Sequence, residues 1–141
     1  MKDRLALAQE WFDRGDRDLD AVQLLHDEYF HTDVIAYHLQ QAIEKYLKGY
    51  LLLNDVRPPR IHDLDTLLHL ASTVEPDLYD PFIDLCEKAT RYYLEERYPP
   101  GPPVEYTHDE IEVDLDLTSE LIRTIRLEVQ QWRQSHDKLS K

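Results

Sequence analysis

The sequence predicts an all-α fold, namely an antiparallel up-and-down bundle of four long helices with one short inserted helix, five helices in total. Two observations support this prediction. The chain holds 22 Leu against 14 Val plus Ile and only three Gly, a balance that favours helix over strand. Apolar residues also recur at intervals of three or four, the period of one helix face. A chain of 141 residues is long enough for one domain, which we expect to span residues 1–141.

The first helix is predicted from about residue 3 to about residue 28. One face of it carries Leu5, Ala8, Phe12, Gly15, Leu19 and Val22. Gly15 lies on this apolar face, where the missing side chain would let a neighbouring helix approach closely. A hinge at Gly15 is the alternative.

The second helix is predicted to begin near Thr32 or Asp33, either of which could cap it, and to end near Asn54. Its apolar face is broad. The segment near 54–62 then breaks the helical pattern, because Pro58 and Pro59 lack backbone donors and favour extended conformations before them. We expect a linker there and a short third helix after it, with Asp63 as its cap.

The fourth helix can start at Pro76 or at Pro81, since proline suits the first turn of a helix. A second linker is predicted near 99–106, where four prolines and a glycine occur in the five residues 99–103. Thr107 and Glu110 have the spacing of a capping box, so the last helix should begin at Thr107.

The net charge of −13 excludes some classes of partner. A strongly negative field repels polyanions, so we expect neither general duplex DNA binding nor membrane-surface binding. Charge is uneven along the chain: residues 42–62 hold four Lys or Arg against two carboxylates, whereas residues 105–120 hold seven carboxylates and no Lys or Arg. The acidic stretch is explained by a solvated face near a helix start, or alternatively by a docking surface for a basic partner.

Metal and cofactor chemistry has little support in the sequence. Cys86 is the only cysteine, which excludes an intramolecular disulfide and a thiolate zinc site and indicates a reducing compartment. None of the seven His forms an i, i+4 pair, so we expect no metal site and no cofactor. The N-terminus does not resemble a leader peptide and no apolar run could span a membrane, so a soluble, cytoplasmic location is predicted.

Basic residues gather at the end of the second helix. Lys45 and Lys48 lie three apart on one helix side, and the helix leads into Arg57, Arg60 and His62. These side chains could form a phosphate-sized pocket, although a helix C-terminus favours Lys without any ligand.

Four segments resemble the HEPN domain family. They are Asp16-Arg17-Asp18-Leu19-Asp20-Ala21, the stretch from His38 to Gly49 that contains Gln41-Ala42-Ile43-Glu44-Lys45, the triplet His62-Asp63-Leu64, and Tyr93-x-x-x-Arg97-Tyr98-Pro99. The resemblance implies a small helical bundle, usually a homodimer, found in prokaryotes and often encoded beside a minimal nucleotidyltransferase in a toxin-antitoxin module. It also implies nucleotide or RNA binding at the matching polar positions, which are Lys45, Lys48, His62, Tyr93, Arg97 and Tyr98.

Many HEPN proteins are metal-independent ribonucleases with an Arg-x4–6-His motif on a late helix. In this chain the only such spacing joins Arg57 to His62 across the proline linker, which makes these two residues the candidate catalytic pair but in an unusual place. Three functions follow as predictions. The first is a nucleotide-binding or nucleotidyltransferase-partner protein without the usual motif; the second is a ribonuclease toxin that uses His62; the third is a purely structural interaction domain that uses its acidic last helix.

Overall fold

A computed structural model describes residues 3–97 and 106–139 of the chain. Its α-helices are α1 (Arg4–Asp27), α2 (Thr32–Leu53), α3 (Leu64–Val74), α4 (Tyr79–Arg97) and α5 (His108–Leu139), and a 3-10 turn, η1 (Pro76–Leu78), joins α3 to α4. Within the described ranges there is no strand. The predicted bundle of four long helices and one short one is therefore confirmed.

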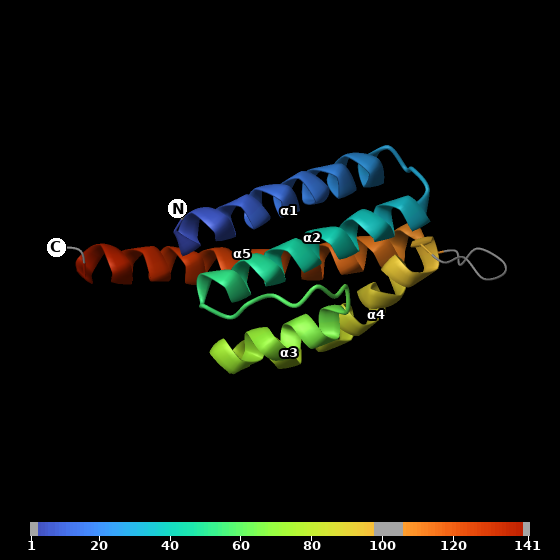
Figure 1. Cartoon of the computed structure of the whole chain (residues 1–141). Helices are drawn as coiled ribbons and strands as arrows, with labels where there is room; N and C mark the ends of the chain where they lie inside the picture. The colour runs from blue at the N-terminus through green and yellow to red at the C-terminus, as the bar shows by residue number, and fades with distance from the viewer. Residues whose placement is uncertain (1–2, 98–105, 140–141) are drawn as a thin grey trace.

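Helix α2 is the centre of the bundle. It packs against α1, α3, α4 and α5, and α1 makes most of its contacts with α2 (Figure 1). Along the bundle α1, α2, α4 and α5 alternate in direction, whereas α3 runs in the same sense as α2 (Figure 1). The described chain therefore begins and ends at the same end of the bundle.

Two glycines allow α1 and α2 to pack closely. A Cβ atom at Gly15 would lie 2.7 Å from Cδ2 of Tyr46, and one at Gly49 would lie 2.6 Å from Cε1 of Phe12. The two aromatic rings stack on each other with centroids 5.1 Å apart. The predicted role of Gly15 in close helix approach is confirmed, and Gly49 has the same role on the facing helix.

Some predicted caps differ in the structure. Helix α2 begins at Thr32 with His31 at its N-cap position, so neither Thr32 nor Asp33 caps it. Asp63 occupies the N-cap position of α3, but its side chain makes no capping bond. The Thr90 hydroxyl of α4 accepts the hydrogen bond from the Leu64 amide instead (2.9 Å), a long-range partner that local spacing cannot predict. Thr107 caps α5 as predicted, since its hydroxyl accepts from the Glu110 amide at 3.0 Å.

The proline linker turns the chain back along α2. Asp55 adopts a left-handed conformation (φ 61°) just after α2, and the next amide, that of Val56, donates to the Leu51 carbonyl at 2.9 Å, which ends the helix. The following residues stay non-helical up to residue 63, and Figure 1 shows them running beside α2. The linker therefore brings His62 back to the middle of α2, where the Gln40 side chain donates to the His62 carbonyl at 3.2 Å. The second predicted linker lies mostly outside the described residues.

Candidate functional site

The basic side chains of α2 pair with two different carboxylates, Asp18 and Glu44. On the side that faces α1, Asp18 accepts from the ammonium of Lys45 and lies 3.0 Å from Nδ1 of His38. The Asp18 side chain is only 12% exposed, so this cluster is largely shielded from water. Lys45 is thus paired within the protein, between α1 and α2.

On the side that faces the linker, Glu44 is the centre of a second cluster. Its carboxylate is nearly buried and lies 2.8 Å from Nδ1 of His62 and 3.3 Å from Nζ of Lys48. Gln40 also donates to Glu44, at 3.2 Å. A nearly buried carboxylate of this kind holds an imidazole in one orientation.

The structure therefore brings together only some of the residues that the sequence singles out. Lys48 and His62 meet at Glu44, whereas Lys45 turns to Asp18. Both ammonium groups are compensated by carboxylates rather than directed at one anion. The prediction that they bind nucleotide stays a prediction, as it does for His62.

The other predicted site residues lie outside these two clusters or outside the part of the chain whose side chains the structure describes. Arg57 lies in the linker and is exposed. Tyr93 and Arg97 belong to the last turns of α4, and their side chains lie outside the described part of the structure. Tyr98 lies outside the described residues altogether.

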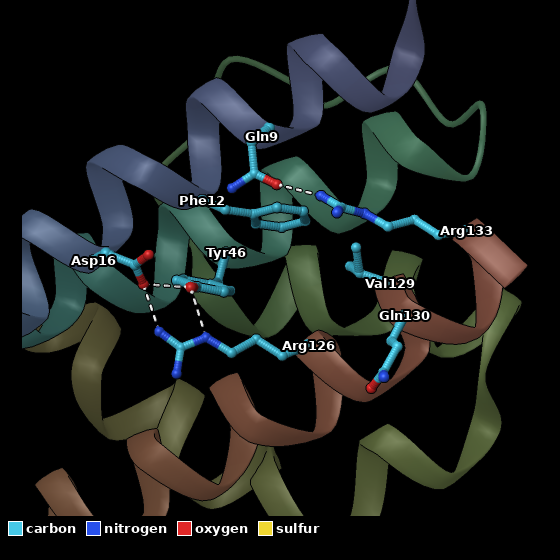
Figure 2. A pocket seen from close by; sticks show the side chains of 8 residues that line it. All are labelled: Gln9, Phe12, Asp16, Tyr46, Arg126, Val129, Gln130 and Arg133. Carbon is cyan, nitrogen blue, oxygen red and sulfur yellow. Dashed lines mark hydrogen bonds and ion pairs between the residues drawn. The ribbon is translucent and has the colours of Figure 1, made fainter.

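A pocket between α1, α2 and α5 contains two arginines that the sequence did not single out. Its volume is about 240 Å³, and we call it the two-arginine pocket. Figure 2 shows Arg126 and Arg133 reaching from α5 toward α1 on either side of Val129. The remaining lining residues are Gln9, Phe12, Asp16, Tyr46 and Gln130.

Arg126 is held firmly at one side of this pocket. One of its Nη atoms donates to Asp16 at 2.7 Å, and its Nε donates to the Tyr46 hydroxyl at 3.2 Å, while that hydroxyl donates to Asp16 (Figure 2). Burial, reinforced by the hydrogen bond to Asp16, raises the pKa of Tyr46 well above its usual value, so its hydroxyl remains a proton donor. Burial alone would lower the pKa of Arg126, but the bonds to Tyr46 and Asp16 outweigh it and raise that pKa. The Arg126 guanidinium is therefore held in place and charged at this side of the pocket.

Arg133 differs from Arg126 in its charge balance. Its guanidinium donates to the neutral side-chain oxygen of Gln9 at 3.0 Å (Figure 2). Among the residues that the structure describes, no carboxylate forms an ion pair with it. The pocket therefore holds two guanidinium groups against the single carboxylate of Asp16, a local positive charge in a chain of net charge −13.

One sequence signal could have located this pocket. Arg126 and Arg133 lie seven residues apart, the distance of two helical turns, and so share one side of α5. The basic residues of the second helix and of the linker after it lie closer together in the sequence and therefore give a stronger local signal. Only packing against α1 shows that both arginines flank the same cavity.

The acidic start of α5 forms a separate hollow. Asp109, Glu112 and Asp116 are exposed and line a cavity of about 370 Å³, together with His26 and His108. Over the described ranges, no group of three or more His, Cys, Asp or Glu side chains is arranged to hold a metal ion. In the same ranges no helix combines the length and the apolar character that crossing a membrane requires.

Comparison with known proteins identifies the family of the chain. No match was found among curated proteins or among solved structures. The model of the HEPN domain matches residues 8–128, which include most of α1, all of α2, α3 and α4, and most of α5. The chain therefore belongs to the HEPN domain family.

Proposed function

We propose that this HEPN protein binds a nucleotide through its phosphate, in the two-arginine pocket. The observation that carries the proposal is Arg133, whose guanidinium is bonded only to the neutral amide of Gln9 among the described residues and stands beside the fixed guanidinium of Arg126. Guanidinium groups bind phosphate oxygens through paired hydrogen bonds, so two of them on one cavity suit a phosphate better than a lone lysine does.

The size of the pocket limits what it can enclose. Its volume of about 240 Å³ is just below the range of about 300–1,000 Å³ that is usual for small-molecule sites. The phosphate and its sugar would fit against Phe12 and Val129, and the base would extend past the opening. Asp16 faces the same cavity, which would favour a monophosphate over the more highly charged triphosphate.

In keeping with the family, we propose that the protein acts in a prokaryotic toxin-antitoxin-like module as a homodimer beside a minimal nucleotidyltransferase. Co-purification with a minimal nucleotidyltransferase from the same organism would support this part of the proposal, and separate elution of the two proteins in gel filtration would contradict it.

Isothermal titration of the protein with AMP and with ATP tests the nucleotide site. Arg133→Gln removes the uncompensated charge without touching the Asp16–Tyr46–Arg126 network and should abolish binding. Arg123→Gln removes an exposed arginine from the same helix, away from the pocket, and should bind as the wild type does. Binding that survives in Arg133→Gln but is lost in Lys45→Ala or Lys48→Ala would place the nucleotide on α2 and overturn the pocket assignment.

A specific observation also favours RNA cleavage as a second candidate function. The buried Glu44 carboxylate orients His62 through Nδ1, while the His62 side chain is 47% exposed. An imidazole held by a carboxylate can accept the proton of an RNA 2′-hydroxyl as general base. Incubation of total RNA and tRNA in EDTA should then give cleavage that His62→Ala, Arg57→Ala and Glu44→Gln reduce. RNA left intact by the wild-type protein at low salt would exclude this function.

A further inference from the structure

The outer face of α5 carries apolar side chains that its own bundle does not cover. Helix α5 packs on α1, α2 and α4. On the remaining face, the side chains of Val113 and Leu127 are 58% and 54% exposed. Single apolar residues on a surface are common, so their spacing decides whether they form an interaction surface.

Val113 and Leu127 belong to a row of residues spaced alternately by four and by three along α5. The row consists of Val113, Leu117, Glu120, Thr124 and Leu127, and we call it the α5 seam. Such spacing repeats every seven residues, which is the pattern by which one helix packs along another in a coiled coil. Leu117 is partly buried against the core, and the Thr124 hydroxyl donates to the Glu120 carbonyl at 2.8 Å, so the polar group of Thr124 is satisfied within its own helix. The α5 seam therefore has the spacing of a surface for a second helix.

Two opposite charges lie at the middle of this seam. The side chains of Glu120 and Arg123 are exposed, and within the described part of the chain neither forms an ion pair. Glu120 belongs to the seam and Arg123 lies beside it. A second copy of the chain, turned by a two-fold axis near residue 122, would bring each Glu120 next to the partner's Arg123. This face of α5 is therefore complementary in charge to a copy of itself.

The same two-fold arrangement also aligns the apolar positions. In an antiparallel helix pair centred on residue 122, residues equally far from that position face each other, which places Leu117 opposite the partner's Leu127. Thr124 faces the partner's Glu120. Residues 108–136 of the two helices then lie side by side, over a length of about 40 Å. Polar residues within a mostly apolar seam are the usual means by which paired helices fix their register.

The α5 seam leaves the two-arginine pocket open. Arg126 and Arg133 reach from the side of α5 that faces α1 (Figure 2). The seam lies on the side of Glu110, which is 3.9 Å from the ammonium of Lys88 in α4. A dimer formed through the seam therefore leaves both nucleotide pockets accessible.

We propose that two copies of this chain pair through their α5 seams, with the two helices antiparallel about a two-fold axis near residue 122. Leu117 packs on the partner's Leu127, and Glu120 pairs with the partner's Arg123. The inference rests on the homodimer of the proposed function and assigns its interface. A second copy is the occupant because the charges are symmetric about one point of the helix, which a different partner would not require.

Charge exchange at this interface tests the pairing, by light scattering and sedimentation of the full chain at about 10–100 µM. Glu120→Arg and Arg123→Glu each place like charges together and should raise the dissociation constant of the dimer by roughly tenfold or more. The double variant with both changes should restore the dimer. Asp20→Arg makes the same change of charge at an exposed position of α1 and should leave the dimer unaltered.

Leucine replacement tests the apolar part of the interface in the same assay. Leu127→Ser should weaken the dimer, whereas Leu24→Ser, at a 62% exposed leucine of α1, should not. All variants change exposed side chains, and circular dichroism shows that they are folded.

Crosslinking tests the antiparallel register. Thr124→Cys lies close to the proposed axis, so a short bismaleimide should join it to the same residue of the second copy. Val113→Cys should not crosslink, because the two copies of that position would lie about 27 Å apart along the helices. The native Cys86 is buried and does not compete for the reagent.

Three results would overturn the proposal, and they are distinguishable. A wild-type protein that is a monomer at about 100 µM would remove the homodimer of the proposed function together with this interface. A dimer that persists in Glu120→Arg and in Leu127→Ser would place the interface on another face and leave the homodimer intact. Crosslinking of Val113→Cys as readily as of Thr124→Cys would show parallel helices. Titration with AMP tests the nucleotide site independently, and its affinity should be the same in Leu127→Ser and in the wild type.

Discussion

The close packing of α1 on α2 leads to a prediction whose sign opposes local helix propensity. In a helix interior, Gly→Ala stabilises by about 1 kcal/mol. At Gly15 the added Cβ would lie 2.7 Å from Cδ2 and 3.0 Å from Cε2 of Tyr46. The Tyr46 ring is 1% exposed and stacks on Phe12, and its hydroxyl is bonded to Asp16. It cannot move aside without breaking one of these contacts.

Overpacking of a filled core costs about 1–3 kcal/mol. After subtraction of the gain of about 1 kcal/mol from helix propensity, we expect Gly15→Ala to lower the free energy of unfolding by up to about 2 kcal/mol. Each kcal/mol lowers the melting temperature of a domain of this size by about 2–8 °C. Because a displaced Tyr46 also loosens Arg126, nucleotide binding in the two-arginine pocket should weaken as well.

Urea unfolding followed by circular dichroism measures this effect. The pair Asp20→Gly and Asp20→Ala, at an exposed position of the same helix, supplies the propensity difference without any packing change. If Gly15→Ala is more stable than the wild type by the amount that this pair shows, the contact with Tyr46 is not tight and the reasoning fails.

Three further predictions follow from buried groups. Gly49→Ala, whose Cβ would lie 2.6 Å from Phe12, should also lower the free energy of unfolding in urea, and an unchanged midpoint would contradict it. Burial, and then the charges of neighbouring acids, raises the pKa of the Cys86 thiol to about 12, so iodoacetamide should label Cys86 only in denaturant; labelling of the native protein at pH 8 would show that the thiol is accessible. The pKa of Glu128 is raised in the folded state, so its stabilising contribution is complete below the ordinary value of 4.5 and is lost as pH rises through the folded value. The melting temperature of Glu128→Gln relative to the wild type should therefore increase between pH 4 and pH 7, and a difference independent of pH would refute the shift.

The sequence determined the class of fold and the extent of most helices. Helical periodicity predicts these features because the core-facing side of a helix is apolar and its solvent-facing side is polar in every turn. Apolar residues at intervals of three or four therefore show where a helix runs and which of its sides is buried. Gly15 was assigned to a close contact for the same reason, since a residue without a side chain on an apolar face has few other uses. The cap of α5 at Thr107 was also predictable, because its partner, the Glu110 amide, is only three residues away.

Only the tertiary structure decided which polar groups pair with each other. Lys45 and Lys48 look alike in the sequence, yet one pairs with Asp18 of α1 and the other with Glu44 of its own helix. The cap of α3 comes from Thr90, which is 26 residues away along the chain. Ion pairs and cavities depend on which helix faces meet and on how the linker returns along α2. The local spacing of residues in the sequence predicts neither the contacts between helices nor the path of the linker. Arg126 and Arg133 form one pocket for this reason: the periodicity of α5 puts them on one side, and the position of α1 makes that side a cavity.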